Sequence, residues 1–246
     1  MPLCCQSVVQ TLPPWPEEFL CLLLLQLLAF AGGMHVKVTG GHLVNNTASM
    51  GLAVLPGSSL QLVGTKATDN HMRDGVIHAF PSAQLTMVNV TMDRNTAAGC
   101  GAAVVLEGPG CQGAISSSEF TNNTAGAAGG AVVVSRSNLT LRHARFVSNA
   151  APKGGALMVS NSTLTVEDSV IENSTAAAIH LPSSHNSHVV SADQTHDPVG
   201  TGGALHSENS SVSLFGTNLT SNMAVLEGGE FCKLCISCST STGLFM

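Results

Sequence analysis

Residues 120–159 read FTNNTAGAAGGAVVVSRSNLTLRHARFVSNAAPKGGALMV and contain the same phrase twice. FTNN is followed by GGAVVV, and FVSN is followed by GGALMV, about 25 residues further along the chain. Repetition at this period is typical of a solenoid, in which every repeat adds one coil and contacts only its neighbours. The stretch therefore predicts a stacked fold.

Two markers extend the repeat in both directions. The first is the second glycine of the GGA phrase, which occurs as Gly130, Gly155 and Gly203 and is matched by Gly75 in DG and by Gly229 in GGE. The second is an apolar residue followed three positions later by an asparagine, which gives Asn46, Asn70, Asn95, Asn123, Asn149, Asn173 and Asn222. Because the two markers stay in step, they predict about eight coils, of which the seventh, at 176–206, is degenerate.

The local pattern within a repeat is that of β-strands. Leu139 and Leu141 alternate with Thr140 and Arg142, and this period of two is typical of a half-buried strand. Two or three such strands per coil, paired in parallel with the next coil, give an all-β fold. We predict a right-handed single-stranded parallel β-helix, a pectin-lyase-like solenoid, over residues 34–230.

Both markers have structural explanations. One asparagine per coil at the same turn can form a ladder in which the side-chain amides bond one another. Glycine permits a positive φ or a close backbone approach at a corner. Stacking on the asparagines also predicts outward neighbours in successive coils, namely Glu119 beside Arg145 and His143 beside Glu167.

The repeated phrases resemble the repeats of chlamydial polymorphic outer-membrane proteins. The resemblance is carried by GGAV at 129–132, GGAL at 154–157 and 202–205, FTNN at 120–123 and FVSN at 146–149. It is clear over 120–229, and weaker coils extend back to about residue 36. The resemblance implies a surface-exposed, passenger-like β-helix whose usual role is adhesion.

Residues 1–33 differ from the repeats. The run FLCLLLLQLLAFA at 19–31 ends in an A-x-A pattern before Gly32, which predicts a cleaved signal peptide. The preceding residues carry Glu17 and Glu18 and no Lys or Arg, which leaves an uncleaved hydrophobic anchor as the alternative. We expect a secreted or cell-surface protein, located in the outer membrane if it is bacterial, whose only membrane contact is an uncleaved N-terminal segment.

Eight asparagines lie in N-x-S/T sequences, the acceptor pattern for N-glycosylation. A repeat rich in Asn and Thr generates many such sequences by composition, so they are glycosylation sites only if the source is eukaryotic and the side chains face outward. The eight are Asn45, Asn89, Asn122, Asn138, Asn161, Asn173, Asn209 and Asn218.

The cysteines suggest two further features. Cys100 and Cys111 bracket the insertion EGPGCQG at 107–113, and in a secreted chain they are expected to form a disulfide, with two buried thiols as the alternative. The tail at 231–246 contains CxxCxxC, three thiols without a fourth ligand nearby, and is expected to be a Cys-rich tail or a truncated coil.

Half of the ten histidines lie in the degenerate segment. Neutral imidazoles and carboxylates suit zinc or nickel, so a weak metal site is conceivable there, although a solvated surface loop explains the segment as well. The candidate ligands are His185, His188, His196 and Asp197.

The composition narrows the function. With a net charge of −6 and nine Lys and Arg in 246 residues, the chain has no basic patch for nucleic acid. We expect a non-enzymatic β-helix without a cofactor that binds glycans or a cell-surface protein. A polysaccharide lyase or hydrolase is the alternative, although its acids would have to cluster and the aspartates are scattered. A fragment without activity is the third reading.

Overall fold

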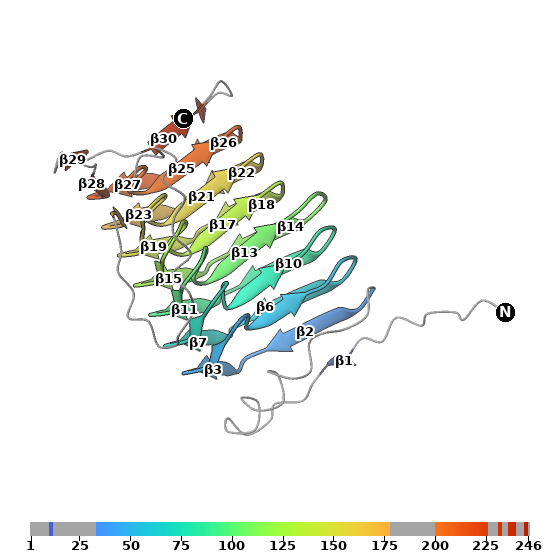
Figure 1. Cartoon of the computed structure of the whole chain (residues 1–246). Helices are drawn as coiled ribbons and strands as arrows, with labels where there is room; N and C mark the ends of the chain where they lie inside the picture. Colours follow the sequence, from blue (N-terminus) through green and yellow to red (C-terminus); the bar gives the residue numbers. More distant parts are fainter. Residues whose placement is uncertain are drawn as a thin grey trace.

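The computed structural model describes residues 33–177 and 200–225 with their side chains, and short strands within 10–11, 231–232, 236–239 and 244–245. In these ranges the chain is built from short strands that stack into a solenoid (Figure 1). Each complete coil passes in turn through four sheets, which we name A, B, C and D. The sequence predicted two or three strands per coil, and the fourth escaped notice because most strands of sheet C have only two residues.

Sheet A is the widest wall, because its seven central strands have five residues each. Its strands, in spatial order, are β1 (Gln10–Thr11), β2 (His35–Thr39), β6 (Ser59–Val63), β10 (Gln84–Val88), β14 (Gln112–Ser116), β18 (Asn138–Arg142), β22 (Thr163–Glu167), β26 (Ser211–Phe215) and β31 (Leu244–Phe245).

Sheet B follows sheet A in each coil and has seven strands. They are β3 (His42–Val44), β7 (Lys66–Thr68), β11 (Thr91–Asp93), β15 (Glu119–Thr121), β19 (Arg145–Val147), β23 (Val170–Glu172) and β27 (Asn218–Thr220). Sheet C is narrower, with β4 (Thr47–Ala48), β8 (His71–Met72), β12 (Thr96–Ala97), β16 (Thr124–Ala125), β20 (Ala150–Ala151), β24 (Thr175–Ala176), β28 (Met223–Val225) and β29 (Phe231–Cys232).

Sheet D closes each coil before the chain returns to sheet A. Its strands are β5 (Leu52–Val54), β9 (Ile77–Ala79), β13 (Val104–Glu107), β17 (Val132–Ser135), β21 (Leu157–Ser160), β25 (Leu205–Glu208) and β30 (Ile236–Ser239). Nearly all pairings are parallel, and the antiparallel pair of β28 with β29 is the exception among the described strands. Strands β30 and β31 show that part of the Cys-rich tail continues sheets D and A.

Alternate residues of every wall fill the interior. Leu139 stacks on Leu164 and Leu141 on Val166 in sheet A, and all four are buried. In sheet B the rings of Phe120 and Phe146 stack with centroids 4.7 Å apart and an interplanar angle of 6°. The predicted alternation and its inward face are thus confirmed in these most regular repeats of the chain.

The predicted asparagine ladder lies at the corner between sheets B and C. Nδ2 of one asparagine donates to Oδ1 of the next at 2.8–3.1 Å from Asn46 to Asn149, and each of these side chains is buried. Asn173 was wrongly assigned to the ladder. Asn173 is exposed and has a left-handed backbone with φ 53°. The buried ladder position belongs to Ser174, whose N–H donates to Asn222 Oδ1 at 3.0 Å.

Counting from Asn173 instead of Ser174 also shifts one of the predicted outward pairs by one residue. Glu119 does stack on Arg145, as predicted. Glu167, however, stacks on Arg142, and the Arg142 Nε lies 2.8 Å from Glu167 Oε2. His143 was therefore the wrong partner, because one step of register turns a strand position into a corner position.

The glycine marker makes the corner between sheets C and D. A Cβ on Gly130 would collide with the backbone of Ala150 and Gly155, so the predicted close approach is confirmed there, and Gly155 and Gly203 repeat it. The preceding residue, Gly129, supplies the positive φ of 59°. Gly229 lies outside the described residues.

The degenerate seventh coil was a wrong prediction. Leu157 of β21 pairs directly with Leu205 of β25, and Thr163 of β22 pairs directly with Ser211 of β26. No described strand lies between them, so the described chain passes from β24 to β25 without an additional coil, and residues 178–199 lie outside the described residues. Sheet B accordingly has seven strands, rather than the eight coils expected.

Candidate interaction surface

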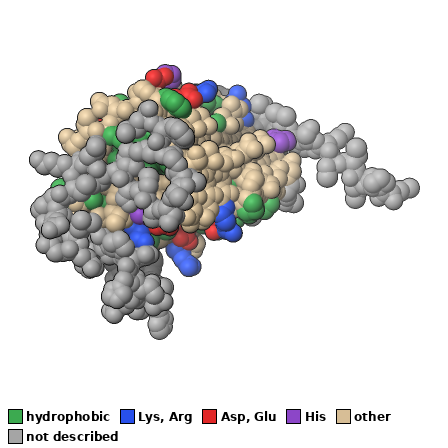
Figure 2. Space-filling model, turned by 90° about the horizontal axis from the view of Figure 1, so that it is seen from above, with side chains coloured by type: hydrophobic (Ala, Val, Ile, Leu, Met, Phe, Trp, Pro, Cys, Tyr) green, Lys and Arg blue, Asp and Glu red, His purple; other side chains and the backbone are tan. Residues whose placement is uncertain are grey.

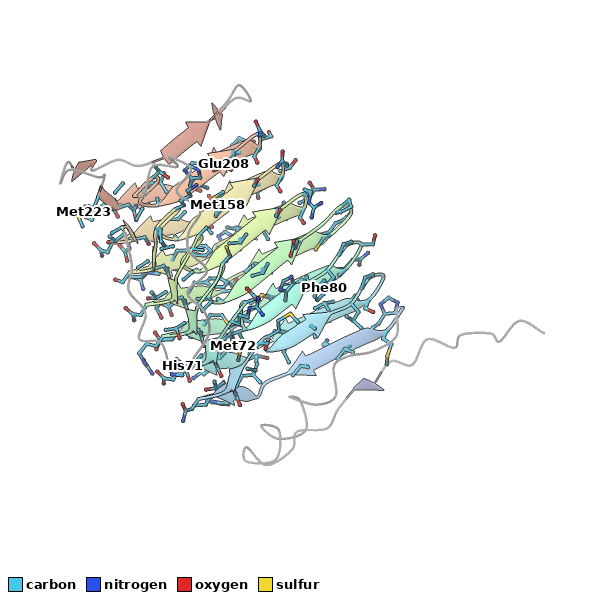
Figure 3. The ribbon with its side chains drawn as sticks, viewed as in Figure 1. His71, Met72, Phe80, Met158, Glu208 and Met223 are labelled. Carbon is cyan, nitrogen blue, oxygen red and sulfur yellow. The ribbon has the colours of Figure 1, made fainter. Side chains whose placement is uncertain are left out.

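Sheet D has an unusual outer face. The middle outward position of its strands forms a column of His78, Val105, Val133, Met158 and His206, which pair in register from β9 to β25. All five are buried although they point away from the core. We call this column the D wall; Met158 marks its upper half in Figure 3.

The glycine corner explains the burial of the D wall. A Cβ on Gly129 would lie 2.6 Å from Val133 Cγ2, so the bare glycine allows the corner to pack onto the outward valine. Val133, Met158 and Ala128 form a small apolar cluster, with Cys100 packed against it. The middle of the D wall is therefore a second, smaller core beside the corner.

The lower end of the D wall carries a histidine held by a carboxylate. His78 Nε2 lies 3.2 Å from Glu107 Oε2, and the imidazole side chain is only 9% exposed. Its ring stacks on Phe80, with centroids 4.4 Å apart. His78 Nδ1 is buried and has no hydrogen-bond partner among the described residues.

The upper end repeats the arrangement. His206 Nε2 lies 2.8 Å from Glu208 Oε1, two residues further along the same strand. His206 stands four coils above His78, which places the two histidine–glutamate pairs about 19 Å apart along the stack. Figure 3 shows Phe80 near the lower pair and Glu208 at the upper one.

Polar groups flank the wall on the side of sheet A. Glu107, which holds His78, also has Arg136 Nη2 3.8 Å from its Oε1, and both side chains are about half exposed. The D wall therefore offers buried imidazoles, an aromatic ring, a guanidinium and carboxylates along one line.

Cys100 and Cys111 do not form the predicted disulfide, because both are free thiols. Cys100 packs outside sheet D, whereas Cys111 belongs to the central core and its Sγ lies 3.8 Å from Ala79 O. The wall itself separates the two side chains. Burial raises the pKa of both thiols, so both remain protonated near neutral pH.

Sheet B carries the charged surface. Arg94 bridges two aspartates of successive coils: its Nε donates to Asp69 Oδ1 at 2.7 Å, and its Nη1 contacts Asp93. The hydrogen bond from Arg94 lowers the pKa of Asp69. Arg145 likewise contacts both Glu119, at 2.9 Å, and Glu172. These carboxylates are therefore neutralised in pairs.

The distribution of charge differs between the walls. Figure 2 shows a face where backbone and uncharged polar side chains prevail and charged side chains lie mainly at the margins. From β6 to β26 the central outward residues of sheet A include Gln61, Thr86, Thr140, Thr165 and Ser213, and below them the same column contains Lys37 of β2. From β6 to β26 sheet A is therefore a neutral hydrogen-bonding wall, whereas sheet D concentrates the imidazole and aromatic groups.

The weak metal site at His185, His188, His196 and Asp197 lies outside the described residues. Within 33–177 and 200–225, no three His, Cys, Asp or Glu side chains are grouped as metal ligands would be. In the part of the chain that is described, no helix has the length and apolar character to cross a bilayer.

Sequence reasoning overlooked the D wall, although a signal was present. His78 follows the marker Gly75 by three residues, and His206 follows Gly203 by the same number. Equal offsets from a repeat marker place side chains in one column. The partner Glu107 could not be found this way, because it was taken as the start of an insertion rather than the end of β13.

Comparison with protein families assigns the fold. The model of the right-handed β-helix region matches residues 28–163, more than half of the chain. The protein belongs to the right-handed β-helix family, and the predicted fold class is thereby confirmed. No curated protein matches the chain.

Proposed function

We propose that this protein is a secreted or cell-surface β-helix that binds an extended glycan along the D wall without transforming it. The observation that carries the proposal is the line of partly exposed side chains along the buried column from His78 to His206, namely Phe80, Glu107, Arg136 and Glu208. An aromatic ring, two imidazole–carboxylate pairs and a guanidinium suit the apolar ring faces and hydroxyl groups of a sugar chain. The length of about 19 Å suits an extended chain rather than a small molecule.

Two further points support a surface role. The GGA and F-x-x-N phrases resemble the repeats of chlamydial polymorphic outer-membrane proteins, for which adhesion is the usual role. The N-terminal apolar run followed by A-x-A has the form of a secretion signal. Binding is favoured over catalysis because the clustered carboxylates of sheet B are held by Arg94 and Arg145.

A polysaccharide-cleaving enzyme is the second candidate, and one observation favours it. The His78–Glu107 pair has the form of a general base oriented by a carboxylate, and His78 Nδ1 is unpartnered. Arg136 beside it could stabilise a developing negative charge.

One experiment separates the two functions. The purified protein is screened on a glycan array, and the best ligand is incubated with it while new reducing ends are measured. Binding without new ends, lost in Glu107→Gln and Phe80→Ala but retained in the control Arg142→Gln, supports the proposal. New reducing ends that disappear in His78→Gln support the enzyme. Absence of binding, or binding that survives at the D-wall variants, refutes the assignment of the site.

Secretion is tested separately. N-terminal sequencing of the exported product should show a start at Gly32. Retention of Met1 in an intracellular product would contradict the surface assignment.

A further inference from the structure

The asparagines of the described ranges divide into two groups. Those of the ladder are buried, whereas all eight in N-x-S/T sequences are exposed. Six of the eight occupy corners with φ between 48° and 55°: Asn45, Asn89, Asn122, Asn161, Asn173 and Asn209. The other two, Asn138 and Asn218, begin β18 and β27.

Alternation of side chains places each acceptor and its hydroxyl on the same side. At the B–C corner Asn122 points outward, Asn123 points into the ladder, and Thr124 points outward again. The ladder residue Asn123 is instead followed two positions later by Ala125, which is buried. The fold therefore presents the asparagine and the hydroxyl residue of the acceptor sequence at the surface, whereas the ladder asparagines are buried and are not themselves the acceptor of such a sequence.

We propose that three corners of the solenoid carry N-glycans and that the fourth, the C–D corner, stays bare, so that the D wall has a bare corner on one side and the glycosylated D–A corner on the other. The D–A corner carries Asn138, Asn161 and Asn209. The A–B corner carries Asn89 and Asn218. The B–C corner carries Asn45, Asn122 and Asn173. Within the described residues the C–D corner has no acceptor sequence, since it is made of the glycine pairs.

The modification is a group transfer from a polyprenyl-pyrophosphate-linked oligosaccharide, the co-substrate. The asparagine Nδ2 attacks the anomeric carbon, the bond from this carbon to the pyrophosphate oxygen breaks, and the pyrophosphate leaves with the electron pair. The amide loses one proton to a base of the transferase. The product is an uncharged, bulky, solubilising group at the corner.

The stack sets the spacing of the glycans. Asn45 and Asn122 are three coils apart, about 14 Å, and Asn122 and Asn173 two coils, about 10 Å. Asn161 and Asn209 occupy adjacent coils, because Ser160 pairs with Glu208 in β21 and β25. Only about 4.8 Å separates these two corners, so a glycan on one hinders the other.

The test uses the full chain behind a heterologous cleavable leader, secreted from a eukaryotic cell. Glycans are released enzymatically in heavy-oxygen water, which marks each formerly occupied asparagine, and peptides are read by mass spectrometry. We expect occupancy at the isolated corners and incomplete occupancy at the Asn161–Asn209 pair. Thr163→Ala, which removes the acceptor sequence of Asn161, should raise occupancy at Asn209 about twofold. Thr163→Ser retains the sequence and is the matched control.

Each result decides the inference. A folded, secreted product without N-glycans overturns it, and so does full occupancy of Asn161 and Asn209 on the same molecule. Glycan-array binding that is equal before and after deglycosylation shows that the D wall stays accessible, whereas binding gained only after deglycosylation shows that glycans at the D–A corner cover it and refutes the D wall as the binding site of the glycosylated protein. The foreign leader exports the chain whether or not the native N-terminus is a signal, and glycan occupancy is read from peptide masses. A failure of the proposed secretion therefore does not affect this test.

Discussion

Replacement of Asn123 with alanine should cost more stability than replacement of its exposed neighbour Asn122 with glycine. Asn123 is fully buried in the ladder. Its Nδ2 donates to Met92 O at 2.9 Å and to Asn149 Oδ1 at 3.1 Å. Its Oδ1 accepts from the backbone N and from Nδ2 of Asn95, at 3.1 and 3.0 Å. Truncation removes all four bonds.

The expected magnitude follows from the groups that lose their partner. The Asn95 N–H, one Asn95 amide hydrogen and the Met92 carbonyl become unsatisfied in a dry corner. At about 1–3 kcal/mol each, with partial relaxation, the free energy of unfolding should fall by about 3–5 kcal/mol. Asn122→Gly keeps the left-handed corner and loses one exposed bond to Asp93, so it should cost less than about 1 kcal/mol.

Urea unfolding of bacterially produced protein, followed by circular dichroism and by hydrodynamic size, measures the difference. Coincidence of the two probes is required first, because stacked repeats can unfold in parts. If Asn123→Ala and Asn122→Gly shift the midpoint equally, the ladder does not stabilise the corner and the reasoning fails.

Three further predictions concern other corners and walls. Gly130→Ala should prevent folding or lower the free energy of unfolding by more than about 3 kcal/mol, because the added Cβ meets the backbone of Ala150 and Gly155. Gly64→Ala has open space around it and should cost only about 1 kcal/mol for its positive φ. Equal midpoints of the two variants in urea would contradict this. Arg94→Gln should raise the pKa of Asp69 to that of an ordinary aspartate, as followed by carboxyl NMR. The lowered pKa means that the pair stabilises the fold above the unfolded-state value, about 3.9, and that this contribution is lost as the pH falls through the folded-state pKa. Cys100 and Cys111 should react slowly with iodoacetamide at pH 7.5 and rapidly after unfolding, because burial raises both pKa values; the finding of a linked peptide pair by mass spectrometry would restore the disulfide.

Much of the architecture could be predicted from the sequence because a solenoid is nearly one-dimensional. Each coil contacts the next, so a repeated residue type reports its own position. Asn123 and Phe120 recur as Asn149 and Phe146 because like side chains stack in a ladder or a pair of rings. The stacking of Glu119 on Arg145 followed directly.

The same reasoning failed where a coil lacks its marker. Ser174 occupies the ladder position, and the exposed Asn173 beside it was taken for the ladder residue. The segment at 176–206 was likewise counted as a coil because its length is close to one repeat, although β21 pairs directly with β25. Length and composition cannot distinguish a rung from a loop, since only backbone pairing between coils defines a rung.

The sequence by itself determined the stacked β-fold, its period, its inward face and the acceptor asparagines, because these depend on alternation and on repetition. Tertiary structure decided which residues became neighbours across the D wall. His78 meets Glu107 from the next coil, and His206 joins the same column because β25 pairs directly with β21. The separation of Cys100 from Cys111 was decided in the same way, since a strand lies between them and only the folded wall shows which side each thiol occupies.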